Sequence, residues 1–195
     1  MKETEITVEV LDSFLSTKNT LEQQGFSCIE TFTMTDKYYS LLKQEKIKNL
    51  SFQNIIKNSF LIRHITSNNC STYNALIYKN KIFNDLGQVI EEEKVQTTVE
   101  NTEKVCDILR LAGFHSYITI QSTNLVYKKD NVEFVVQDVN NLGLFIELEE
   151  LEHMETLKPE EKINQLINIL KQLKLPLGDN FHCNKLEMLL KKDNQ

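Results

Sequence analysis

Glycine and proline are scarce in this chain, whose 195 residues include only 5 glycines and 2 prolines. Linkers between domains are usually rich in these residues, so their scarcity leaves no candidate domain boundary. The length suits one well-filled domain and is too short for two domains of ordinary size. We therefore expect a single domain that spans residues 1–195.

Long apolar runs and a surplus of positive charge are also missing. No stretch reaches the length of a membrane-spanning helix, and the acidic start Met1–Glu5 is not that of a signal peptide. The formal net charge of −6 and the pI near 5.3 disfavour nonspecific binding to nucleic acids or anionic membranes. Four widely spaced cysteines, without metal-site spacing, are typical of reduced thiols in a cytoplasmic protein: Cys28, Cys70, Cys106 and Cys183.

The most informative segment that is present reads D-V-N-N-L-G-L-F-I-E-L-E-E and covers residues 138–150. Its second half alternates as a strand does, which places Glu147 and Glu149 on one face and apolar side chains on the other. Asp138, across a short loop, is a candidate to join them. Like charges on an internal face are costly unless a cation lies between them, so the pattern predicts a divalent-metal site. The alternative is an edge strand with a solvated acidic face.

Short strands and amphipathic helices alternate along the rest of the chain. Three helix starts have candidate capping or first-turn residues, namely Asp12 or Ser13, Asn101 or Thr102, and Pro159. A short helix over Asn184–Leu190 is expected at the end of the fold. Eight strands are expected at Thr7–Leu11, Thr33–Ser40, Ser59–Ile65, Tyr73–Tyr78, Val95–Val99, Ser116–Tyr127, Val132–Asp138 and Leu144–Glu149.

These elements indicate an α+β fold with mostly antiparallel strands and helices packed outside. Several strands carry apolar residues on one side and polar or acidic residues on the other. If the apolar sides meet the helices, the polar sides face either water or an enclosed lumen. Eight strands can close into a barrel with room for side chains and one small ligand. We therefore predict a closed eight-stranded antiparallel barrel whose polar interior is a ligand site.

Five motifs follow one another in a characteristic order between residues 5 and 149. They are E-I-T-V-E-V from Glu5, T-D-K-Y-Y from Thr35, S-F-L-I-R from Ser59, L-I-Y-K from Leu76, and Q-D-V-N-N-L-G-L-F-I-E-L-E from Gln137. This order resembles the CYTH family, the triphosphate tunnel metalloenzymes that include class IV adenylate cyclases and thiamine triphosphatases. The last motif, similar to the family's D-x-V-x-x-L-G-x-F-x-E-I-E, is the most specific one.

The resemblance implies a tunnel in which basic side chains hold a triphosphate and carboxylates hold Mg²⁺ or Mn²⁺. The implied roles are metal ligation by Glu5, Glu147 and Glu149, phosphate binding by Arg63 and Lys79, and catalysis by Arg63 and Asp138. Further tunnel-lining residues are expected at Thr7, Glu9, Tyr39, Gln121 and Thr123. The implied activity is metal-dependent processing of ATP or another triphosphate, by cyclisation or by hydrolysis. The implied partner is a small molecule, no nucleic acid or membrane partner is expected, and a homodimer is left open.

The chain departs from the family pattern where the family has basic residues. The E-x-E-x-K of the first strand corresponds to Glu5-x-Thr7-x-Glu9, and a shift of two residues restores a second acid without supplying a lysine. The K-x-R of the sixth strand corresponds to Gln121 and Thr123. The fifth strand should begin R-x-E but reads E-E-E-K-V-Q-T, whose acidic run 91–93 is expected to be a solvated hairpin end.

Hydrogen bonds to charged groups contribute about 1.5–3 kcal/mol each, so the loss of three or four would remove about 5–10 kcal/mol of triphosphate binding. Only two arginines are present, and compensation would need Lys37, Lys81, Lys94, Lys128 or Lys129. We therefore expect weak turnover. The alternative is a noncatalytic CYTH module that binds a less anionic or a cationic ligand. Three or fewer lysine and arginine head groups in the lumen would favour that alternative.

Overall fold

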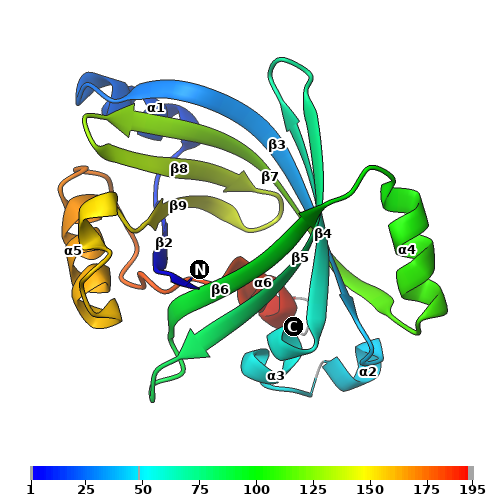
Figure 1. The fold of residues 1–195 in the computed structure, drawn as a ribbon. Helices are drawn as coiled ribbons and strands as arrows, with labels where there is room; N and C mark the ends of the chain where they lie inside the picture. The colour runs from blue at the N-terminus through cyan, green and yellow to red at the C-terminus, as the bar shows by residue number, and fades with distance from the viewer. Residues whose placement is uncertain (1, 48, 193–195) are drawn as a thin grey trace.

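A nine-stranded antiparallel sheet curls into a nearly closed barrel (Figure 1). The computed structural model describes residues 2–47 and 49–192, and within them the strand order is β1-β6-β5-β4-β3-β7-β8-β9-β2. The strands are β1 (Lys2–Glu3), β2 (Glu5–Glu9), β3 (Ser27–Ser40), β4 (Ser59–Ser67), β5 (Thr72–Phe83), β6 (Val89–Thr98), β7 (His115–Lys129), β8 (Val132–Val139) and β9 (Gly143–Glu149).

The N-terminal segment joins the two edges of the sheet. β1 pairs with β6 at one edge and β2 pairs with β9 at the other, with only Thr4 between them. The Thr4 N–H donates to a carboxylate oxygen of Glu150 at 2.9 Å, and the Glu150 N–H donates to the Thr4 carbonyl at 2.9 Å. Because Thr4 interrupts the ladder, the first strand is divided into two. The expected closed antiparallel barrel is confirmed, but its strand count is nine rather than eight.

The helices lie outside the sheet or at one end of the barrel (Figure 1). The expected caps are confirmed, because Ser13 Oγ accepts the Ser16 N–H and Asn101 Oδ1 accepts the Lys104 N–H. No helix among the described residues has both the length and the apolar character needed to cross a membrane. The helices are α1 (Phe14–Gln23), α2 (Gln44–Ile47), α3 (Phe52–Lys57), α4 (Thr102–Leu111), α5 (Pro159–Lys171) and α6 (Lys185–Lys192), with a 3₁₀ turn at Glu152–Met154.

The main hydrophobic core lies between the outer face of the barrel and helices α1 and α5. Ile6 and Val8 of β2 and Ile146 of β9 are fully buried there, as is Leu166 of α5. This arrangement follows from the period of two in a strand, because the same alternation that turns these side chains outward turns the residues between them into the barrel. The helices therefore cover the apolar face and leave the polar face to line the lumen.

A second buried cluster fills part of the barrel interior. Leu186 of α6 and Ile56 of α3 pack with Tyr38, Ile120 and Val139 from three strands, and all five also border the cavity described below. The inner face of the barrel is therefore apolar near α3 and α6 and carries charged side chains further along, where Met34, Ile65 and Val135 also line it. This change of character along single strands decides which side chains reach the cavity.

Candidate functional site

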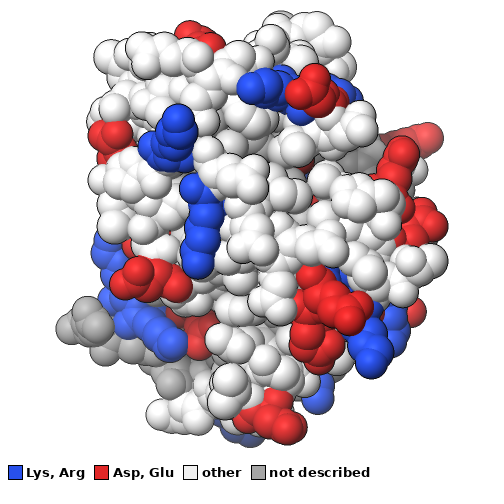
Figure 2. Space-filling view, turned by 90° about the vertical axis from the view of Figure 1, so that its left-hand side faces the viewer, with Lys and Arg blue, Asp and Glu red and all other residues white. Residues whose placement is uncertain are grey.

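The barrel encloses a cavity of about 210 Å³ whose walls carry many charged side chains. On the outer face shown in Figure 2, charged side chains of both signs are scattered among uncharged ones. The cavity instead gathers charges that come from β2, β3, β4, β5, β6, β9 and α6. Its acidic residues are Glu5, Asp36, Glu147 and Glu149, and its basic residues are Arg63, Lys79, Lys81, Lys94 and Lys185.

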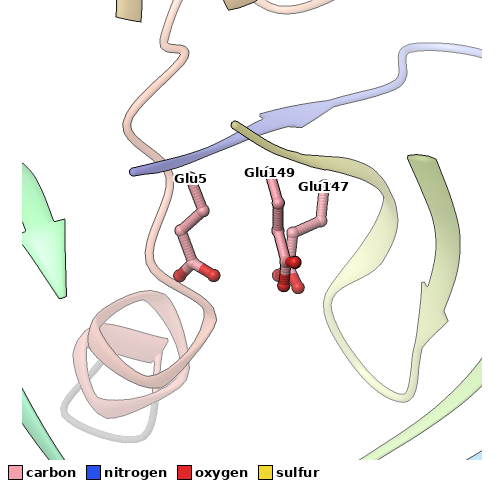
Figure 3. Close-up of side chains that lie close together, drawn as sticks. All are labelled: Glu5, Glu147 and Glu149. Atoms are coloured by element: carbon pink, nitrogen blue, oxygen red, sulfur yellow. The ribbon is translucent and has the colours of Figure 1, made fainter. Parts of the chain in front are cut away.

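Three carboxylates converge at one side of this cavity (Figure 3). In the register of β2 and β9, Glu5 lies opposite Glu149 and Thr7 lies opposite Glu147, so adjacent strands point all of these side chains inward. One carboxylate oxygen from each of Glu5, Glu147 and Glu149 lies within 4.8 Å of the others. The alternation in the sequence therefore placed Glu147 and Glu149 on a common face, as expected, and pairing with β2 adds Glu5.

The electrostatics of these carboxyls fit a divalent cation. Burial raises the pKa of Glu149, and the charges of Glu147 and Glu5 raise it further. A cation among the three carboxylates would relieve this repulsion. Three carboxylates provide hard oxygen ligands, the type that Mg²⁺ and Mn²⁺ prefer in proteins. The donor set therefore fits the metal that the sequence resemblance implies.

A buried ion-pair network connects the acidic cluster to β5 and β6. Lys79 Nζ lies 2.8 Å from one carboxylate oxygen of Glu92, and Lys81 Nζ lies 2.6 Å from the other. Lys81 also lies 3.6 Å from Glu5. Burial alone would raise the pKa of Glu5, but Lys81, Lys79 and two further lysines lower it to about 2. The acidic run at 91–93 is therefore not simply a solvated hairpin end, because Glu92 is only 3% exposed.

Arg63 is held in the lumen by Asp36. The two residues are opposite one another on β4 and β3, and the Arg63 guanidinium donates two hydrogen bonds to the Asp36 carboxylate, at 2.7 and 2.6 Å. Burial alone would lower the pKa of Arg63, but the charge of Asp36 raises it, so the guanidinium stays charged. Tyr38, two residues after Asp36, also borders the cavity.

Lys185, the first residue of α6, brings a fifth basic head group into the cavity. Its ammonium donates hydrogen bonds to Glu147 Oε2 and to Gln137 Oε1. Lys94 of β6 is paired with Glu3 at 3.6 Å. Nothing in the sequence distinguishes Lys185 from the surface lysines, since only the packing of α6 brings it into the lumen. Five cationic residues thus line the cavity, more than the three or fewer that would favour a less anionic ligand.

Comparison with known proteins supports one fold. No protein-family model matches the chain. A protein of Methanocaldococcus jannaschii named "Putative adenylate cyclase MJ0240" is 29% identical over 97 residues, which span 49% of this chain and about half (54%) of that relative. The PH1819 protein of Pyrococcus horikoshii has a similar structure with a TM-score of 0.74 and 19% identity, covering 97% of this chain and 99% of its own.

Two further structures extend this likeness to proteins described as adenylate cyclases. A "putative adenylate cyclase" of Vibrio parahaemolyticus has a TM-score of 0.65 and 14% identity, with coverage of 96% of this chain and 97% of that chain. HpAC1 of Hippeastrum, described as a "putative adenylyl cyclase" with a dominant triphosphatase activity, has a TM-score of 0.59 and 14% identity, with coverage of 98% and 96%. The chain has the CYTH fold. At these identities the likeness to the solved structures is one of fold.

Within this CYTH fold, three expected site residues of β7 and β8 face away from the cavity. Asp138 is exposed and lies opposite Thr123, while Gln121 accepts a hydrogen bond from the Asn140 side chain at 3.3 Å. Their neighbours Ser122 and Gln137 line the cavity instead. The predicted inward positions on β7 and β8 are each one residue away from the observed ones. In a strand, a shift of one residue moves a side chain from the inner face to the outer face. Asp138 therefore cannot act on a ligand in the cavity from this position.

Two other expected lining residues of the CYTH tunnel also lie elsewhere. The Tyr39 hydroxyl is 3.1 Å from Cys106 Sγ, outside the barrel and beneath α4, whereas Tyr38 faces inward. Glu9, at the end of β2, is half-buried beside Gly178 and does not border the cavity. The remaining expected residues do line it, namely Glu5, Thr7, Arg63, Lys79, Glu147 and Glu149. Of the proposed compensating lysines, Lys81 and Lys94 line it as well.

Proposed function

We propose that this CYTH-fold protein binds ATP or another triphosphate in its barrel with a divalent metal ion and cleaves a phosphoanhydride bond of it. One observation carries the proposal, namely that a three-carboxylate cluster and five basic side chains face the same enclosed cavity. A triphosphate carries about four negative charges and needs cationic donors for its oxygens, while its metal needs oxygen ligands. Both requirements are met by side chains that line one cavity.

Each group of side chains has a distinct role in this proposal. Glu5, Glu147 and Glu149 would hold Mg²⁺ or Mn²⁺, while Arg63 and Lys79 would bind phosphate oxygens. A divalent ion bound there would offset phosphate charge and polarise the phosphorus–oxygen bonds. Arg63, held by its two hydrogen bonds, presents its charge in a fixed orientation, which lowers the cost of ordering it on ligand binding. We propose no role for Asp138.

Two reactions are compatible with this assignment. In hydrolysis, water forms a bond to the terminal phosphorus, the bridging phosphorus–oxygen bond breaks, and the water proton passes to solvent. In cyclisation, the ribose 3′-oxygen forms a bond to the α-phosphorus, pyrophosphate leaves, and the hydroxyl proton passes to solvent. HpAC1, which has a similar fold, is described both as a putative adenylyl cyclase and as having a triphosphatase activity. Both reactions should therefore be assayed.

A specific observation also favours a noncatalytic or weakly active protein. Each of the five basic residues that line the cavity is already paired with a carboxylate, as in Arg63 with Asp36 and Lys79 with Glu92. An anionic ligand has to compete with these carboxylates, which reduces the net gain from each new ion pair. The second candidate function is therefore a CYTH binding module for a less anionic or cationic ligand.

One assay separates the two candidates. Purified protein is incubated with Mn²⁺ or Mg²⁺ and, separately, with ATP, thiamine triphosphate or tripolyphosphate, and the products are resolved by ³¹P NMR. Turnover that is abolished by Glu147→Ala and by Arg63→Ala, but not by Glu133→Ala at an exposed position that does not border the cavity, is the expected result. Cyclic AMP with pyrophosphate identifies the cyclase, and ADP with phosphate identifies the hydrolase. Absence of turnover with all three substrates would refute the catalytic proposal.

A further inference from the structure

Lys185 makes a direct hydrogen bond to a carboxylate of the acidic cluster. Its ammonium donates to Glu147 Oε2 and to Gln137 Oε1, and its side chain is 18% exposed. The helix behind it is anchored, because Leu186 and Leu189 are buried in the cluster that includes Phe145. The ammonium is thus carried on a flexible four-carbon side chain that projects from a fixed point beside the cavity.

Glu147 is at the same time one of the three clustered carboxylates. By contrast, Lys81 lies at the longer distance of 3.6 Å from Glu5, and across residues 2–47 and 49–192 Glu149 forms no ion pair. A divalent ion held by this cluster would lie within a few ångströms of the Lys185 ammonium. Two cations at such a distance repel one another strongly inside a protein. Glu147 is therefore expected to bind either the Lys185 ammonium or the divalent ion, but not both at once.

We propose that Lys185 is a positioning residue that holds the Glu147 carboxylate while no metal is bound and releases it to the divalent ion. This inference rests on the proposed metal site and deepens it. Only the lysine side chain has to move, since Leu186 and Leu189 fix the helix. The released ammonium stays in the cavity, where an anionic ligand is its natural new partner. Metal binding thereby adds a free cation to the phosphate side of the site.

The proposal predicts that removal of the lysine charge strengthens metal binding. Mn²⁺ binding to the full chain, without nucleotide or phosphate, is measured from the EPR signal of free Mn²⁺. We expect Lys185→Met to bind Mn²⁺ about tenfold or more tightly than the wild type, because the competing charge is gone. Lys185→Arg keeps the charge and is expected to bind Mn²⁺ like the wild type.

Two controls make this result specific. Lys94→Met also removes a charge from the cavity wall, but Lys94 pairs with Glu3 outside the cluster, so a clearly smaller gain is expected. An equal gain in Lys94→Met and Lys185→Met would overturn the proposal in favour of a general charge effect. Glu149→Gln should weaken Mn²⁺ binding in both the wild-type and the Lys185→Met background. Thermal unfolding of each variant establishes that it is folded.

A crystal structure of the wild type with Mn²⁺ alone gives a second, independent measurement. The expected result is a metal ion at the carboxylate cluster and a Lys185 ammonium no longer within hydrogen-bonding distance of Glu147. Mn²⁺ binding with Lys185 still bonded to Glu147, or unchanged affinity in Lys185→Met, would overturn the exchange and leave the metal site intact. No Mn²⁺ binding to the wild type or any variant would overturn the metal site and the exchange together.

Discussion

Arg63 and Asp36 form a two-armed ion pair across neighbouring strands inside the barrel, with nitrogen–oxygen distances of 2.7 and 2.6 Å. The pair is buried, since the Asp36 side chain is only 6% exposed. Because Asp36 holds the orientation of the charged Arg63, the acid belongs to the proposed phosphate-binding half of the site as much as the arginine does. The T-D-K-Y-Y motif therefore contributes through Asp36 and Tyr38, the two residues of it that face inward.

Asp36→Asn should destabilise the protein substantially. The substitution leaves the Arg63 guanidinium partly buried without its counter-charge, and breaking a buried pair in this way costs about 3 kcal/mol. The free energy of unfolding is measured by urea denaturation. Asp138→Asn, on the exposed outer face, is the matched control and should change it by less than about 0.5 kcal/mol. Similar losses in the two variants would contradict the role of the pair.

Glu5→Gln should show a characteristic pH dependence. The folded protein holds the pKa of Glu5 at about 2, below its usual value of 4.5, so the ionised carboxylate stabilises the folded state. That contribution is present above about pH 4.5 and is lost as the pH falls from 4.5 toward 2. At neutral pH the variant should be less stable by about 3 kcal/mol, given about 1.4 kcal/mol for each pKa unit.

The Glu5 prediction is tested by chemical denaturation of the wild type and Glu5→Gln between pH 2 and pH 7. The stability difference should shrink as the pH falls through this window. Glu133→Gln, at an exposed position that does not border the cavity, should differ from the wild type by less than about 0.5 kcal/mol throughout. If the stability difference between the wild type and Glu5→Gln stays constant with pH, the neighbouring lysines do not lower the pKa of this carboxyl.

Lys79→Met should weaken the binding of tripolyphosphate about tenfold or more. Loss of one charge-assisted hydrogen bond costs about 1.5–3 kcal/mol, and each 1.4 kcal/mol is a factor of ten in affinity. Isothermal titration calorimetry in the presence of Mg²⁺ provides the measurement. Lys128→Met removes an equal charge at an exposed position that does not border the cavity, where Lys128 pairs with Glu133, and should leave the affinity unchanged. Equal effects of both substitutions would argue against ligand binding in the lumen.

Leu166→Ala should destabilise the packing of α5 on the barrel. Leu166 is fully buried in the main core, and truncation of such a leucine costs about 2–5 kcal/mol through lost burial and an unfilled cavity. Leu111→Ala is the matched control, because Leu111 is 86% exposed at the end of α4. The midpoints of urea unfolding should therefore separate clearly. A loss of less than about 1 kcal/mol in Leu166→Ala would mean that α5 contributes little to the fold.

The sequence predicts much of the fold because its signals are local. The alternation around Glu147 and Glu149 places both acids on one face, and Ser13 and Asn101 cap helices where they were expected. Such patterns depend only on the geometry of a strand or of a helix end. Helices α2 and α3, of four and six residues, were not predicted because segments this short carry no clear periodicity.

The β7 strand shows why the site was predicted only in part. Ile120 is apolar and faces the lumen beside α6, while Leu125 and Tyr127 are apolar and face outward toward the helical layer. The apolar row thus changes faces within one strand, since the barrel is filled at one end and covered outside at the other. Alternation alone does not reveal which parity points inward. The prediction took Gln121 and Thr123 from the K-x-R spacing of the family, whereas Ser122 between them lines the cavity.

The sequence by itself determined that Glu147 and Glu149 share one face of β9, because alternation along a strand fixes that relation, and the order of its motifs predicted the barrel. Only the tertiary structure decided the charge balance of the cavity. Lys81, Lys94 and Lys185 come from three separate elements, and each enters the lumen through strand register or helix packing. Glu92, in a run of three acids, is buried by the same register. The sequence does not show whether a given lysine or glutamate is exposed to solvent or enclosed in the barrel. Only the closure of the barrel distinguishes the two cases.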